Sequence, residues 1–245
     1  MNKQINRIPK IVHYCWFGGK EKPILINKCI ESWKQNLPEY EIREWNEYNF
    51  DVNSNLYVKE AFETRKFAFV SDYVRVFALY HFGGIYLDTD VEVFKSFNDL
   101  LHYESFWGFE QEQYIATSTI GAAKHNSLIK VFLDSYEGKR FIQDGGKHNE
   151  LTNVAIITKI LKDFGLKADG RYQELAGKGV FFPQAFFSPY DYINCRKFLS
   201  KDTYTVHYFY KSWLPPKARL KGQFKLILSK MIGGDNIAKL RKIIP

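Results

Sequence analysis

The chain is predicted to form an α/β domain, because strand-like and helix-like segments alternate along its 245 residues. Residues 8–17 and 40–45 have the character of strands. Between them, residues 23–36 begin with proline and carry apolar side chains at helical spacing, which indicates a helix. Hydrophobic residues make up 45% of the composition, so the chain can bury the core of one full domain with an appendage.

Residues 55–82 are predicted to form one long helix that is apolar on most sides and therefore buried. Its polar residues are then informative. Ser71 and Arg75 are four residues apart and share a face, while Asp72 borders that face three residues before Arg75. Two interpretations are open: Asp72 and Arg75 pair only with each other, or these side chains face a cleft. Gly83 then ends the helix.

The segment after this helix carries an Asp-x-Asp triplet in a strand-like setting. From Ile85 to Val93 every odd position is apolar or Thr, which predicts one continuous strand with Asp88, Asp90 and Glu92 on its other face. Two carboxylates this close are costly to leave facing each other unless a cation lies between them. Manganese and magnesium take such carboxylate oxygens and keep sites open for phosphate.

The triplet alone is weak evidence, since chance supplies about one in a chain of this length. A solvated carboxylate pair is the alternative. The aromatic and apolar flank at residues 82–87 favours a buried strand instead, because an exposed edge strand would not need it.

The rest of the chain continues the alternation of elements. Residues 181–187 are aromatic and interrupted by Pro183, which predicts an edge or loop segment. The other expected elements are strands at 106–110, 114–120 and 201–210, the last carrying His207, and helices at 126–136 and 152–164, the last begun by a Thr152 cap.

The cysteine count and the N-terminal sequence favour a cytoplasmic protein. Three cysteines without a CxxC spacing indicate neither a disulfide framework nor a zinc site. No signal-peptide pattern is visible, and no apolar stretch approaches the ~20 residues of a membrane span.

The basic character belongs to the C-terminal tail. Residues 211–245 hold nine Lys and Arg against one acid, so they account for the whole net charge of +8. We expect a catalytic domain at 1–213 and a basic amphipathic helical extension at 214–245, separated by Pro215 and Pro216. The extension suits an anionic membrane surface, and a solvated C-terminus is the alternative. A basic stripe confined to one end is weak evidence for nucleic acid, which we do not expect as a partner.

Three blocks in this order carry a family resemblance: residues 8–19, 71–94 and 207–213. Together they resemble the DXD-containing sugar-nucleotide transferases of glycosyltransferase family thirty-two, which include bacterial capsule and lipopolysaccharide enzymes, yeast α-mannosyltransferases and, more distantly, clostridial toxin domains. The resemblance implies a GT-A fold, a single Rossmann-like α/β domain with a mixed central sheet. It also implies a nucleotide sugar, a divalent metal and transfer that retains the anomeric configuration.

The same resemblance assigns residues to the donor. Trp16 matches an aromatic residue that packs on the nucleobase, although a core tryptophan is the alternative. Ser71, Asp72 and Arg75 match positions facing the ribose, sugar and phosphate, and Tyr86 is similar to a tyrosine that borders the sugar-phosphate.

The resemblance also implies the metal ligands. Asp88 and Asp90 match the DXD carboxylates, with Asp90 in direct metal contact and Asp88 on the metal or a ribose hydroxyl. His207 matches a late metal ligand, and a structural histidine is the alternative. Ser212 and Trp213 match residues that close over the diphosphate.

We therefore expect a metal-dependent retaining transfer of a hexose or N-acetylhexosamine from a nucleotide diphosphate sugar, with a UDP-sugar favoured. The expected acceptor is a glycan or lipid-linked glycan of capsule or lipopolysaccharide biosynthesis, reached at the inner face of the cytoplasmic membrane. The metal, with Arg75, would neutralise charge on the leaving diphosphate, with Asp72, Arg75, Asp88 and Asp90 as catalytic groups.

Two other functions fit parts of the sequence. A haloacid-dehalogenase-like phosphatase would use Asp88 as nucleophile, but the motif lies far from the start of the chain and Gly234-Asp235 has no partner Asp four residues on. A non-catalytic membrane-surface-binding protein would explain the tail alone, and it leaves the neutral body unexplained.

Overall fold

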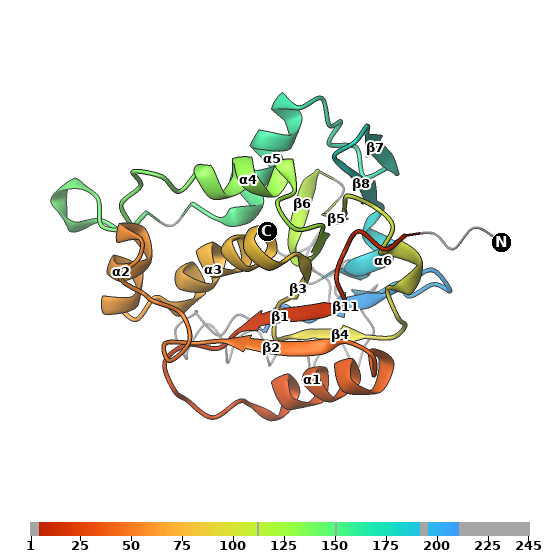
Figure 1. Cartoon of the computed structure of the whole chain (residues 1–245), viewed down its shortest axis with the longest axis horizontal. Coiled ribbons are helices and arrows are strands. Elements are labelled where there is room, and N and C mark those ends of the chain that lie inside the picture. The colour runs from red at the N-terminus through yellow and green to blue at the C-terminus, as the bar shows by residue number, and fades with distance from the viewer. Residues whose placement is uncertain (1–4, 112, 150, 192–195, 211–245) are drawn as a thin grey trace, which may run out of the picture.

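The computed structural model describes residues 5–111, 113–149, 151–191 and 196–210 (Figure 1). Its centre is a seven-stranded sheet, in which the β1–β2, β1–β3 and β5–β8 pairs are parallel and the β3–β6, β5–β6 and β7–β8 pairs are antiparallel. The predicted α/β class with a mixed central sheet is thus confirmed. In spatial order the strands are β2 (Glu41–Trp45), β1 (Ile11–Cys15), β3 (Gly84–Leu87), β6 (Tyr114–Ala122), β5 (Ser105–Glu110), β8 (Gly179–Phe182) and β7 (Gln173–Leu175).

Helices cover both faces of this sheet and define two cores. One core is built under α3 and its neighbours and takes Tyr86 from β3, while the other lies under α1 and takes Ile85 and Leu87 from the opposite face of the same strand. The helices are α1 (Ile24–Asn36), α2 (Leu56–Glu63), α3 (Phe67–Phe82), α4 (Ser127–Asp134), α5 (Asn153–Asp163) and α6 (Gln184–Phe187).

Two small antiparallel pairs lie outside the main sheet. The pair that matters for the site joins β4 (Val91–Val93) to β11 (Thr205–His207), so that the last strand lies beside the segment that follows the DXD motif. The other pair is β9 (Tyr190–Asp191) with β10 (Arg196–Lys197), and short 3-10 turns occur at Asn98–Leu100 and Asp144–Gly146.

Most predicted elements are confirmed; β5 and β6 are longer than predicted, and the others are shorter. Thr152 caps α5 as expected, because its hydroxyl accepts the amide of Ala155. The confirmed elements are β1, α1, β2, β5, β6, α4, α5 and β11.

The prediction of one helix over residues 55–82 is wrong. The chain forms α2 and α3, with a break at Thr64–Lys66 where Arg65 adopts a φ of 57°. A residue in this left-handed region ends a helix, and the amide of Lys66 then returns to the carbonyl of Ala61. The break turns α3 onto the central strands.

The prediction for residues 181–187 is also wrong. Their first part belongs to β8, a buried strand held between β5 and β7 and not an edge. Pro183 follows the last strand residue and stands at the N-cap of α6, where its missing amide costs no ladder hydrogen bond.

No helix in the described part of the chain is long and apolar enough to span a bilayer. The predicted extension at 214–245 lies outside the described residues.

Candidate active site

The DXD motif lies in a turn and not in a strand. The predicted continuous strand from Ile85 to Val93 is therefore wrong: β3 ends at Leu87, and the amide of Val91 donates to the carbonyl of Asp88 at 3.0 Å. The amide of Asp88 still donates to the carbonyl of Ser118 on β6 at 2.8 Å. The turn is thus anchored to the centre of the sheet while β4 leaves it.

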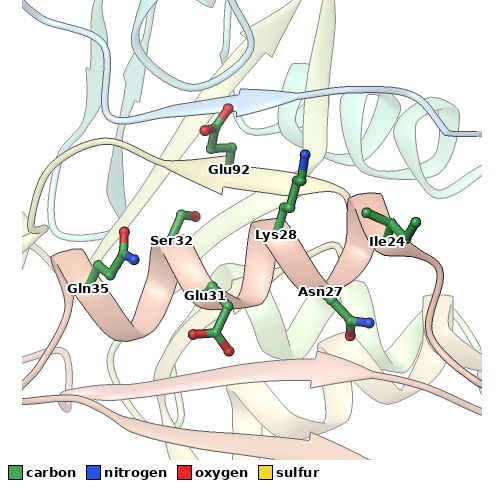
Figure 2. A pocket seen from close by; sticks show the side chains of 7 residues that line it. All are labelled: Ile24, Asn27, Lys28, Glu31, Ser32, Gln35 and Glu92. Carbon is green, nitrogen blue, oxygen red and sulfur yellow. The ribbon is translucent and has the colours of Figure 1, made fainter.

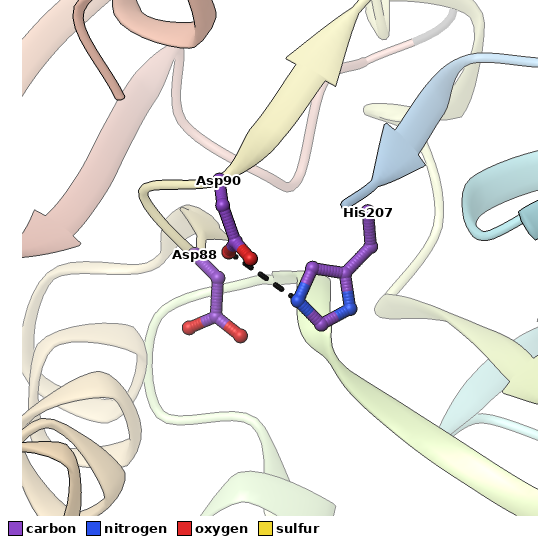
Figure 3. A group of neighbouring side chains, drawn as sticks. All are labelled: Asp88, Asp90 and His207. Atoms are coloured by element: carbon purple, nitrogen blue, oxygen red, sulfur yellow. Dashed lines mark ion pairs between the residues drawn. The ribbon is translucent and has the colours of Figure 1, made fainter. Parts of the chain in front are cut away.

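The turn brings three candidate ligands together. One side-chain ligand atom from each of Asp88, Asp90 and His207 lies within 4.8 Å of the other two (Figure 3). The register of β11 on β4 places His207 opposite Val91, the residue after Asp90. Its Nε2 lies 3.3 Å from a carboxylate oxygen of Asp90.

Asp90 is held in place by main-chain and side-chain groups. Its side chain is buried, and one carboxylate oxygen accepts the amide of Tyr210 at 2.6 Å. Burial alone would raise the pKa of Asp90, but His207 and the Tyr210 amide outweigh burial and hold it below its usual value. Burial would likewise lower the pKa of His207, and the Asp90 charge instead raises it to about 9.

These side chains fit a divalent cation. Two carboxylates and an imidazole form a recognised donor set for such ions. Nδ1 of His207 is also buried and has no hydrogen-bond partner among the described residues. This nitrogen points away from the two carboxylates, whereas Nε2 faces Asp90 and is the atom available to an ion held between them (Figure 3).

Arg75 ties α3 to this turn. Its guanidinium lies 3.0 Å from Asp88 and 3.2 Å from Asp72, and it donates to the carbonyl of Thr117 at 2.9 Å. It also lies over the ring of Tyr86, 4.6 Å from the centroid. Burial would lower the pKa of Arg75, but the Asp88 charge raises it, so the side chain stays charged.

With this geometry established, comparison with known proteins is informative. Residues 23–107 match the family model described as a glycosyltransferase sugar-binding region containing a DXD motif. The turn with Asp88 and Asp90 lies inside the matched residues, whereas Trp16 and His207 lie outside them.

Two curated relatives come from Schizosaccharomyces pombe. Inositol phosphoceramide mannosyltransferase 3 is 30% identical over 138 residues, which is 53% of this chain and 38% of that protein. Inositol phosphoceramide mannosyltransferase 2 is 25% identical over 134 residues, 53% of this chain and 39% of that protein. The chain thus matches less than two-fifths of the length of either relative.

Among solved structures, the PaToxG glycosyltransferase superposes with a TM-score of 0.48 at 17% identity. The match covers 64% of this chain and 69% of that one.

Three other predicted site residues, Tyr86, Ser71 and Asp72, lie among the matched residues and differ in their contacts. The Tyr86 hydroxyl donates to Asp88 at 3.1 Å. The Ser71 hydroxyl donates to the carbonyl of Phe67 in its own helix at 3.0 Å, so it makes no contact with the carboxylates. Burial raises the pKa of Asp72 to about 7, with Arg75 opposing the rise and Asp88 adding to it.

Glu92 does not share a face with the DXD carboxylates, and that prediction is wrong. It lines a pocket of about 460 Å³ along α1, with Lys28, Glu31 and Ser32 on its other side (Figure 2). Its carboxylate accepts the hydroxyl of Tyr208. The turn breaks the alternation, so a residue two positions after Asp90 points elsewhere.

Trp16 lies just after the carboxyl end of β1, next to the strand that leads into the turn. It is half-buried, and its indole nitrogen donates to the carbonyl of Lys20 at 2.6 Å. As a partly buried residue it also packs against the core under α1. Ser212 and Trp213 lie outside the described residues.

Sequence reasoning missed one contributor to the site, the amide of Tyr210, which no side-chain pattern could reveal. It also missed a buried polar group of the fold. His13 is fully buried on β1, and its ring bridges the carbonyl of Gly83 at 2.8 Å and the indole nitrogen of Trp45 at 3.1 Å. A histidine inside an otherwise apolar strand was the available signal.

Proposed function

We propose that the protein is a metal-dependent retaining glycosyltransferase that moves a hexosyl group from a nucleotide diphosphate sugar to a glycan or lipid-linked glycan. The observation that carries this proposal is the convergence of Asp88, Asp90 and His207 beside Arg75, within and next to a sugar-binding region. Asp88, Asp90 and His207 would hold manganese or magnesium.

The residues suggest how the leaving group is stabilised. A bound divalent ion supplies positive charge to the departing diphosphate. Arg75 adds a second, permanent charge beside Asp88, and its Nε is buried without a partner among the described residues, so it remains available as a donor. The Tyr86 hydroxyl donates to the same carboxylate oxygen of Asp88 as Arg75 does. The acceptor hydroxyl would lose its proton to the departing phosphate, on the face from which the diphosphate leaves.

A phosphatase mechanism through Asp88 is less compatible with this geometry. One oxygen of Asp88 already accepts hydrogen bonds from Arg75 and Tyr86. These two contacts hold the carboxylate as a ligand rather than exposing it for attack on phosphorus.

The nucleotide sugar that serves as donor, and the cellular process that uses it, are proposed as follows. Two curated relatives are named mannosyltransferases, which brings GDP-mannose beside the UDP-hexoses and UDP-N-acetylhexosamines. We propose a role in surface polysaccharide synthesis at the inner face of the cytoplasmic membrane, with residues 214–245 as the membrane-contacting segment on the basis of their charge.

A thermal-shift panel tests the function. The wild-type protein is mixed with GDP-mannose, UDP-glucose, UDP-galactose or UDP-N-acetylglucosamine, with and without manganese. We expect one nucleotide family to raise the midpoint only when manganese is present, because a ligand that binds the folded state stabilises it.

Two variants sharpen this experiment. Asp90→Asn should keep the fold and lose the manganese-dependent shift and sugar transfer, while Asp163→Asn, an exposed carboxylate at the end of α5, should behave as the wild type. A full shift and full transfer activity in Asp90→Asn would contradict the proposal. So would a wild-type protein that no nucleotide sugar stabilises in the presence of manganese.

A further inference from the structure

The strand order sets out how a nucleotide sugar would lie along the sheet. In α/β sheets, ligands bind beyond the carboxyl ends of the strands. Here Trp16 follows β1, the DXD turn follows β3, and β6 and β5 come next across the sheet. A nucleobase near Trp16 and a diphosphate at Asp88 and Asp90 would direct the hexosyl ring over β6 and β5.

The carboxyl end of β5 carries a further acidic residue, Glu110. It lies on the same face of the strand as Gly108, two residues earlier. A Cβ on Gly108 would meet the ring of Phe187 at 2.8 Å, and the carbonyl of Phe187 accepts the hydroxyl of Thr205 at 2.7 Å. Phe187 therefore links Gly108 of β5 to Thr205 of β11.

From that contact, β5 and β11 run toward the DXD turn together. Two residues on, β5 reaches Glu110 and β11 reaches His207. The charge of Glu110 lies close enough to His207 to act on it electrostatically. Glu110 is outside the group of three that can share one ion, so it lies beside the metal position and not in it.

An exposed aromatic residue stands next to this carboxylate. Tyr114 on β6 is the direct antiparallel partner of Glu110, so both side chains are on the same face. Tyr114 is 44% exposed at the carboxyl-end edge of β5. A carboxylate that accepts hydroxyl hydrogen bonds beside an aromatic face that packs on C–H groups is the chemistry that binds a sugar ring.

We propose that Glu110 and Tyr114 form the subsite for the transferred hexosyl ring, Glu110 accepting its hydroxyls and Tyr114 packing on its apolar face. This inference rests on the proposed function and deepens it: the metal and Arg75 take the diphosphate, and this pair recognises the sugar. The pair therefore determines which nucleotide sugar is accepted, and it leaves binding of the nucleotide alone unchanged.

Calorimetric titration in saturating manganese tests the subsite. Each protein is titrated with GDP and GDP-mannose, and with UDP and UDP-glucose. In Glu110→Gln and in Tyr114→Ala, the dissociation constant of the sugar nucleotide divided by that of the nucleotide should rise about tenfold. For Glu110, this change corresponds to the free energy of a hydrogen bond to a charged group. The nucleotide constant should stay within about twofold. Tyr114→Phe keeps the ring and should bind as the wild type.

Glu104→Gln is the matched control, because it makes the same change just before the opposite end of β5, where the carboxylate pairs with Arg7 on the surface. Unchanged ratios in both Glu110→Gln and Tyr114→Ala would overturn the subsite and leave the proposed function standing on Asp90. An equal loss of nucleotide binding would place Glu110 on the metal or diphosphate and would also overturn it. A wild-type protein that binds neither sugar nucleotide would overturn the proposed function and this inference together.

Discussion

The guanidinium of Arg75 lies 3.0 Å from Asp88 and thereby joins α3 to the turn that carries the DXD motif. The same group lies 3.2 Å from Asp72, so one buried cation faces two carboxylates. The pairing of Asp72 with Arg75 that the sequence allowed is present, but it is only part of the contact. Because Asp88 shares Arg75, the position of the turn depends on the helix.

Replacement of Arg75 should therefore affect stability and activity together. In Arg75→Met, two partly buried carboxylates lose their buried partner, which costs about 3 kcal/mol of the free energy of unfolding. In Arg75→Lys, a single ammonium cannot reach Asp72, Asp88 and the Thr117 carbonyl at once, so transfer should still fall about 100-fold. Urea unfolding and initial rates of sugar transfer measure the two effects.

Arg43→Lys provides the control for this prediction. Arg43 pairs with Glu41 on the surface of β2 at 2.7 Å, and such a pair contributes about 0–1 kcal/mol. Wild-type transfer in Arg75→Lys would show that the guanidinium geometry is not used.

The N-cap residues of α4 and α5 should differ in their contribution to stability. Asn126 is buried; its side-chain oxygen accepts two amides in the first turn of α4, and its amide donates to the carbonyls of Glu104 and Lys178, both at 3.1 Å. Thr152 is exposed and accepts only one amide, at 3.4 Å. Asn126 thus fixes α4 to two other segments, whereas Thr152 serves its own helix.

We expect Asn126→Ala to lower the free energy of unfolding by about 2–3 kcal/mol, because it removes the cap of α4 and the hydrogen bonds to the Glu104 and Lys178 carbonyls. Thr152→Ala should lower it by about 1 kcal/mol or less. Equilibrium unfolding of both variants in urea gives the comparison. Equal losses would mean that the cross-links from Asn126 to Glu104 and Lys178 add nothing.

Local patterns predicted most elements, and they failed where a distant segment decides the structure. Residues 85–93 alternate without interruption, because Thr89 occupies an odd position and hides the turn. What ends β3 is a change of partner: β3 pairs with β1 and β6, whereas β4 pairs with β11, more than 100 residues later in the chain. No local pattern contains that information.

In the site, too, local patterns predicted some residues, and pairing between distant segments decided the others. The motif located Asp88 and Asp90, and the resemblance located His207, which the structure brings to them through the β4–β11 pair. Glu110 was not predicted, because a glutamate at a strand end is ordinary in sequence. A role for Glu110 is indicated only by the strand order, which brings it near His207.

The buried His13 gives the last prediction, a dependence of stability on pH. Burial lowers the pKa of His13 to about 4, so the ring is neutral in the folded protein. In the unfolded chain the pKa returns to about 6.5. Between these values the unfolded state binds more protons, so stability is complete above about pH 6.5 and falls as the pH decreases toward 4. At pH 4 the loss from this one group should approach about 3 kcal/mol.

His13→Gln isolates this contribution, because the variant retains an amide donor toward the Gly83 carbonyl and cannot titrate. The difference in unfolding free energy between the wild type and His13→Gln should shrink by about 3 kcal/mol from pH 7 to pH 4. Carboxylates that titrate in the same range affect both proteins equally and cancel. His125→Asn, at an exposed position, should leave the pH dependence as in the wild type. A difference that stays constant across this range would show that His13 is already protonated in the folded state.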